Sequence, residues 1–149
     1  MKRIVFAFMA LLMGAATFAG INDPKPNTKA ETATIYIYRT GSWSGAGNNW
    51  AMFVDDKKVC KLSNNRYIKV EVAPGKHRVS SKIGGIEVLK KETEIEIEAE
   101  AGKSYFVACN VKQSLTRARL EMTEVTKSSA DKQMEKMSLD KCQEEAETK

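Results

Sequence analysis

The single histidine of the chain, His77, is the residue on which most acid–base chemistry would have to depend. A catalytic triad needs a nucleophile and an orienting carboxylate beside the imidazole. The candidates are Ser80, Ser81 and Asp55, but no nucleophile elbow surrounds them. Because His77 follows a Pro-Gly-Lys turn and begins an expected strand, we interpret it as a turn residue that hydrogen-bonds locally. The sequence therefore predicts no catalytic residue and no enzyme activity.

Acidic and cysteine residues do not form a recognisable metal site. Asp55 and Asp56 are adjacent, but calcium takes about six to eight oxygen ligands and no DxDxDG loop is present. We expect this pair to support a hairpin turn. With one histidine and no Cys-x-x-Cys pair, a zinc site of ordinary spacing is excluded. We predict no metal and no cofactor.

A row of glutamates alternates with apolar residues near position 95 and could attract cations or a basic partner. We interpret it as a solvated sheet face that discourages edge-to-edge pairing. Its members are Glu94, Glu96, Glu98 and Glu100.

The loop 40–49, TGSWSGAGNN, is the strongest candidate for recognition. It lacks the Lys-Ser/Thr ending and the following helix of a phosphate-binding loop. Trp43 has no local apolar partner, and exposed aromatic residues on loops often make binding contacts. We predict a binding surface formed by Trp43, Asn48 and Asn49. The alternative is that Trp43 folds back over a sheet edge.

The three cysteines are an odd number. Cys60 and Cys109 lie in apolar, strand-like runs, so a Cys60–Cys109 disulfide is the pairing we favour, provided that their Cα atoms lie within about 7 Å. The alternative is two buried free thiols, since free cysteine packs as a small apolar residue.

The N-terminus is typical of an export signal. Lys2 and Arg3 precede the apolar run 4–13 and a series of small residues. The run is shorter than the about 20 residues that cross a bilayer. We predict a cleaved signal peptide over 1–19, a flexible leader over 20–32, and a periplasmic or secreted protein without stable membrane insertion. A retained N-terminal anchor is the alternative.

Charge and cysteine position exclude two further classes. The first cysteine is Cys60, far beyond the apolar run, so the protein is not expected to be a lipoprotein. The 24 Lys and Arg residues are interleaved with 19 Asp and Glu. Nucleic-acid binders concentrate basic residues on one face, and we therefore expect no nucleic-acid partner.

Alternation with a period of two predicts an all-β fold over 33–126. Two runs, 33–39 and 104–111, are apolar on both faces and are expected to be interior strands. The expected class is an antiparallel β-sandwich of about seven or eight strands. The tail 127–149 changes period and predicts a short, marginal C-terminal helix beginning with a capping box at Ser128 and Asp131. The predicted strands are 33–39, 50–55, 57–62, 66–72, 77–83, 86–98, 104–111 and 116–125.

Four segments carry a family resemblance: 36–39 (YIYR), 50–62, 67–79 with its Pro-Gly-Lys-His turn, and 97–107. Their order resembles the bacterial exported family called domain of unknown function 2846 (DUF2846), with some similarity to the β-sandwich modules named for a Pro-Glu-Gly-Ala (PEGA) motif. The resemblance implies an all-β exported domain with no established biochemical activity. Many members carry a lipobox cysteine, which this chain lacks.

These observations favour a non-enzymatic binding or structural module of the cell envelope, with another envelope protein or a polymer as partner. Two alternatives remain. One is a hydrolase of envelope polymers, which is disfavoured because the sequence contains no recognisable acid–base machinery. The other is a small-molecule binder with a pocket between its sheets.

Overall fold

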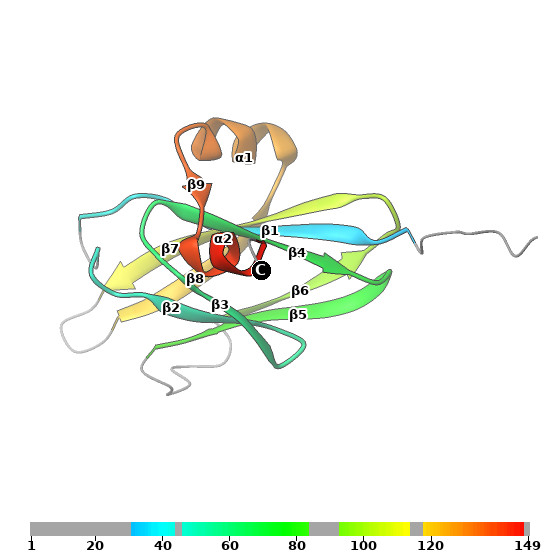
Figure 1. Cartoon of the computed structure of the whole chain (residues 1–149), viewed down its shortest axis with the longest axis horizontal. Helices are drawn as coiled ribbons and strands as arrows, with labels where there is room; N and C mark the ends of the chain where they lie inside the picture. Colours follow the sequence, from blue (N-terminus) through cyan, green and yellow to red (C-terminus); the bar gives the residue numbers. More distant parts are fainter. Residues whose placement is uncertain (1–30, 44–45, 84–92, 114–117, 148–149) are drawn as a thin grey trace, which may run out of the picture.

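The computed structural model contains two β-sheets (Figure 1). Alternating apolar side chains form the core that the two sheets share. The structure describes residues 31–43, 46–83, 93–113 and 118–147. The strands are β1 (Ala33–Arg39), β2 (Trp50–Val54), β3 (Lys57–Leu62), β4 (Arg66–Val72), β5 (Gly75–Lys82), β6 (Glu94–Ala99), β7 (Ser104–Gln113), β8 (Ala118–Val125) and β9 (Ser138–Leu139). The helices are α1 (Lys127–Met134) and α2 (Lys141–Glu147).

The predicted all-β sandwich is confirmed. One sheet has the order β8-β7-β1-β4-β9 and the other β3-β2-β5-β6. As predicted, β1 and β7 are interior strands. The five-stranded sheet is mixed rather than wholly antiparallel, because β1 pairs parallel with β7 and β4 pairs parallel with β9. Parallel neighbours need long crossover connections, and the segment between β1 and β7 contains the entire second sheet.

The core lies between the two sheets. Ile35 and Ile37 of β1 are fully buried, and Trp50 at the start of β2 is only 1% exposed. The alternation predicted near position 95 is confirmed, since Ile97 is buried while Glu96 and Glu98 are exposed. Burial of this kind contributes about 25 cal/mol per Å² of apolar surface, so the alternating pattern is the main determinant of the fold.

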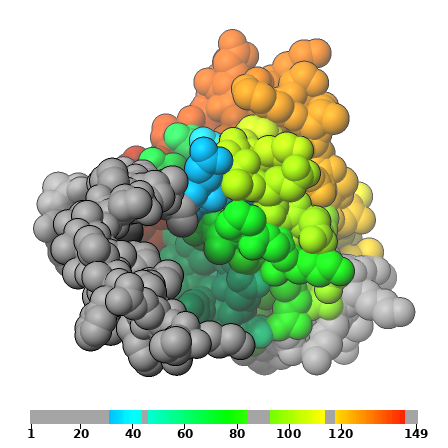
Figure 2. Space-filling view, turned by 90° about the vertical axis from the view of Figure 1, so that its right-hand side faces the viewer, coloured from blue at the N-terminus to red at the C-terminus, as the bar shows by residue number. Residues whose placement is uncertain are grey.

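Helix α1 of the C-terminal tail packs on the outer face of the five-stranded sheet. Tyr38, Phe106 and Ala108 form a second apolar cluster with Ala130 of α1, and the Tyr38 hydroxyl donates to Gln133 Oε1 at 2.9 Å. In Figure 2 the tail, in orange, stands above β1 and the start of β7. This packing is why a helix with a thin apolar stripe is stable here.

The tail differs from its prediction in two respects. It contains two helices separated by β9, rather than one helix. The α1 N-cap is Thr126, whose side chain accepts from Ser129 N, so the predicted capping box at Ser128 and Asp131 is wrong. Thr126, two positions before Ser128, is the residue whose hydroxyl satisfies an unpaired N–H group of the first turn, that of Ser129.

Several predicted features lie outside the described residues. These are the signal peptide 1–19, most of the leader 20–32, and the first part of the predicted strand 86–98. Among the residues that are described, no helix has the length and apolar character needed to cross a membrane.

Candidate functional site

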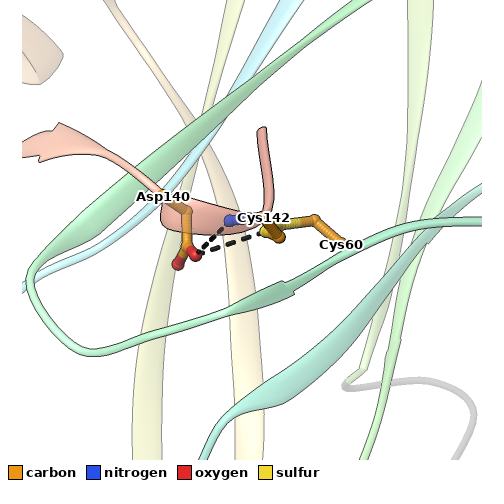
Figure 3. A group of neighbouring side chains, drawn as sticks. All are labelled: Cys60, Asp140 and Cys142. Carbon is orange, nitrogen blue, oxygen red and sulfur yellow. Dashed lines mark hydrogen bonds between the residues drawn. A yellow bond between two sulfur atoms is a disulfide. The ribbon is translucent and has the colours of Figure 1, made fainter. Parts of the chain in front are cut away.

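A disulfide joins Cys60 on β3 to Cys142 on α2, with their Cα atoms 6.0 Å apart (Figure 3). The predicted Cys60–Cys109 pairing is therefore wrong. Because β9 pairs with β4 and α2 contacts β3, the tail brings Cys142 to Cys60. The sequence pattern predicts only a short, marginal helix for the tail and contains no sign of this return.

Cys109 is a free thiol on β7, only 1% exposed. Burial raises the pKa of the Cys109 thiol to about 12, because the thiolate would lose its hydration. It therefore stays protonated at neutral pH and is poorly nucleophilic. The alternative of a buried free thiol is confirmed for this residue.

Asp140 lies beside the disulfide and is buried, with 3% of its surface exposed. Its Oδ2 accepts a hydrogen bond from Ser63 N at 2.7 Å. Its Oδ1 accepts from Cys142 N at 3.4 Å and lies 3.2 Å from Cys142 Sγ. The carboxylate thereby connects the start of α2 to the turn after β3.

Cys60, Asp140 and Cys142 also have metal-ligating atoms that all lie within 4.8 Å of one another. A metal would bind cysteine as the thiolate, and the disulfide occupies both sulfur atoms. While the disulfide is intact, Cys60 and Cys142 therefore attach the tail covalently to β3.

His77 uses both ring nitrogens. Nδ1 lies 2.6 Å from Asp55 Oδ2, and Nε2 lies 2.7 Å from the Ala73 carbonyl oxygen. Since both partners are acceptors, both nitrogens must donate, which requires the protonated ring. The hydrogen bond to Asp55 raises the pKa of His77. The interpretation of His77 as a turn histidine agrees with this geometry.

The serines considered with His77 do not join it. Ser80 and Ser81 are buried on β5, and no hydrogen bond connects either one to His77 within the described ranges. The orienting carboxylate of a triad is thus present in Asp55, but among the residues that the structure describes no nucleophile is paired with the imidazole.

Asp55 and Asp56 form the turn between β2 and β3, with φ angles of 48° and 63°. Positive φ at both central positions is typical of a two-residue hairpin turn. Asp55 Oδ1 accepts from Arg78 N at 3.0 Å, and Asp56 Oδ2 accepts from Arg78 Nη2 at 2.6 Å. The hydrogen bond from Arg78 N, followed by the one from His77, lowers the pKa of Asp55. The expected turn role of Asp55 and Asp56 is confirmed, and both side chains also accept hydrogen bonds from Arg78 on β5.

Hydrogen bonds to the sandwich hold loop 40–49 at two of its described positions. Arg39, fully buried at the end of β1, donates through Nη1 to the Asn48 carbonyl oxygen at 2.6 Å. On the other side, Asn64 Oδ1 accepts from Ser42 N at 3.1 Å, and Asn64 Nδ2 donates to Ser42 O at 3.2 Å. The backbone of the loop is therefore held to the sandwich at Ser42 and at Asn48.

Trp43 is 100% exposed, so the alternative in which it folds back over a sheet edge is wrong. Asn48 and Asn49 are exposed on the same loop. Their binding role remains a prediction. Sequence reasoning missed the anchors, although Arg39 gave a signal: a charged residue occupies the inward register of Ile35 and Ile37.

The protein-family model described as "Protein of unknown function (DUF2846)" matches residues 29–121, which include β1 through β7. The chain belongs to the DUF2846 family. A comparison with curated proteins found no match. In this DUF2846 protein, α1, Asp140 and Cys142 lie beyond the matched residues.

Proposed function

We propose that this DUF2846 protein is an exported, non-enzymatic binding module of the cell envelope. Its partner, another envelope protein or a polymer, would contact loop 40–49. The observation that carries the proposal is Trp43, a large apolar side chain that is fully exposed. Aromatic residues such as tryptophan are enriched among the few interface residues that contribute most of the binding energy.

The hydrogen bonds that hold the loop support this role. Arg39 and Asn64 hold the backbone on either side of Trp43, which reduces the conformational entropy that binding would cost. The hydrolase alternative is disfavoured because both His77 nitrogens already hold partners. A general base needs a free nitrogen within reach of its substrate.

Binding is tested with Trp43→Ala in sedimentation with isolated envelope fractions. We expect Trp43→Ala to reduce co-sedimentation at least about tenfold, as losing about 1.4 kcal/mol of binding energy would. Trp43→Phe is the matched control and should retain most of the binding. Thermal unfolding should be unchanged in both variants, since the side chain is exposed. Equal sedimentation of Trp43→Ala and wild type would contradict the proposal.

Export is tested separately. Residues 1–19 fused to a phosphatase that is active only outside the cytoplasm should give activity. Removal of the apolar run 4–13 should abolish it. A fusion that remains inactive would contradict the export part of the proposal while leaving the loop experiment standing.

A further inference from the structure

A cleft of about 400 Å³ lies between α1 and the outer face of the five-stranded sheet. This volume falls within the about 300 to 1,000 Å³ of small-molecule sites. Tyr67, Tyr36 and Phe106 line it from the neighbouring strands β4, β1 and β7, and Met134 and Met137 line it from the tail. The small-molecule alternative placed a pocket between the sheets, whereas this cleft lies outside them.

The three aromatic rings form a continuous row. Tyr36 and Phe106 are directly paired in the β1–β7 register, and their rings are stacked with centroids 5.1 Å apart. Tyr67 is tilted against the other side of the row, 6.4 Å from the Tyr36 centroid. Sheet register therefore holds the rings in place without any ligand.

Polar atoms in the cleft remain available. In the part of the chain that the structure describes, neither the Tyr36 nor the Tyr67 hydroxyl makes a hydrogen bond, unlike that of Tyr38, which bonds to Gln133. The Ser104 side chain also lines the cleft and is exposed. A bound molecule would therefore find several unused donors and acceptors.

The charge of the cleft is negative although the chain as a whole carries +5. Lys127, Asp131 and Glu135 follow one another at intervals of four along one side of α1. Lys127 Nζ pairs with Asp131 Oδ2 at 2.7 Å, which neutralises both. Glu135 makes no ion pair within the described ranges, and the C-terminal end of α1 adds partial negative charge beside it.

We propose that this cleft binds an organic cation, an alkylated ammonium group on a small apolar body. Aromatic rings attract such cations through their electron-rich faces, and the ring faces that lie outside the Tyr36–Phe106 stack are the ones that would do so here. Met134 and Met137 supply flexible, polarizable side chains that adapt to the alkyl groups, and Glu135 supplies the opposite charge. An anion would be repelled by Glu135, and a neutral ligand would gain no charge attraction from it.

The probe is choline, compared with its uncharged carbon isostere 3,3-dimethyl-1-butanol. Both are titrated into the full-length protein carrying ¹³C-labelled methionine methyl groups, and the Met134 and Met137 methyl signals are followed by NMR. We expect choline to shift these two signals saturably, and the isostere to bind at least about fivefold more weakly, equivalent to about 1 kcal/mol. Equal binding of the isostere, saturable shifts confined to other methionines, or no saturable shift would overturn the proposal.

Two variants separate charge from packing. Glu135→Gln should weaken choline about fivefold and leave the isostere unchanged. Glu96→Gln, an exposed carboxylate on β6 in the other sheet, is the matched control and should change neither. Thermal unfolding verifies that both variants fold. Unchanged choline affinity in Glu135→Gln would overturn the proposal. Because Trp43→Ala should leave choline binding intact, this test is independent of the loop proposal.

Discussion

Cys60 and Cys142 are 82 positions apart in the sequence, and their disulfide fastens the C-terminal tail to the edge strand β3. The same tail places β9 beside β4 at the edge of the other sheet. Exposed sheet edges are sites of unwanted strand pairing. The Cys60–Cys142 disulfide therefore helps to keep β9 on β4 at the edge of one sheet. It also holds α2 against β3 at the edge of the other sheet.

Loss of this disulfide should strongly destabilise the protein. Cross-linking residues this far apart restricts the unfolded chain and is expected to contribute about 4 kcal/mol. Urea unfolding of Cys142→Ser should show a loss of that size, and wild type with reductant should approach the same midpoint. Reductant should have no further effect on Cys142→Ser. A wild-type midpoint that is insensitive to reductant would contradict the prediction.

Cys109 should be unreactive in the folded protein. Its thiol is buried and its pKa is raised to about 12, so little thiolate is present at neutral pH. An aromatic disulfide reagent should detect no thiol in the native protein and one after denaturation without reductant. Denaturation after full reduction should reveal all three cysteines. Rapid labelling of the native protein would contradict the buried position.

Local patterns predicted most of the sandwich because they report burial directly. Ile35 and Ile37 alternate with tyrosines and form an interior strand, and the Asp55-Asp56 pair forms the hairpin turn. Both outcomes depend on neighbours in sequence. The alternation of residues along a strand fixes which side chains are buried whatever the strand pairs with.

The disulfide and the cleft could not be predicted in the same way. Cys142 reaches Cys60 only because the tail crosses an edge of each sheet, which no periodicity encodes. The aromatic row likewise needs the parallel register that places Tyr36 beside Phe106. That pairing joins strands separated by the entire second sheet. Long-range pairing of this kind is the information that a single sequence lacks.

The His77–Asp55 pair should make stability depend on pH. The pKa of His77 is raised above its ordinary 6.5, so its contribution is complete below about pH 6.5 and is lost as pH rises through the raised value. The pKa of Asp55 is lowered below its ordinary 3.8, so its contribution is complete above that pH and is lost as pH falls through the lowered value. The His77–Asp55 pair therefore contributes most to the stability of the fold between about pH 3.8 and about pH 6.5.

Replacement of His77 measures this effect. Urea unfolding of His77→Leu should show a loss of about 1 kcal/mol at about pH 5.5 and a smaller loss at about pH 9, because the contribution of the raised His77 pKa is lost as the pH rises. Asp55→Asn should reduce the same pH dependence, and the double variant should lose little more than either single one. A gap between wild type and His77→Leu that does not change with pH would exclude the charged pair.

Asn64 should control the order of the loop that carries Trp43. Asn64→Ala removes both hydrogen bonds to the Ser42 backbone, so the Ser42 amide should exchange hydrogen at least about fivefold faster, equivalent to about 1 kcal/mol of lost local stability. Tryptophan fluorescence anisotropy should fall in the same variant, because Trp43 gains mobility while Trp50 stays buried, and global unfolding should change by no more than about 1 kcal/mol. Asn110→Ala, an exposed position on β7, is the matched control and should leave exchange at Ser42 unchanged. Because a more mobile loop loses more conformational entropy on binding, Asn64→Ala should also weaken co-sedimentation with envelope fractions. Unaltered exchange at Ser42 would show that Asn64 does not hold the loop.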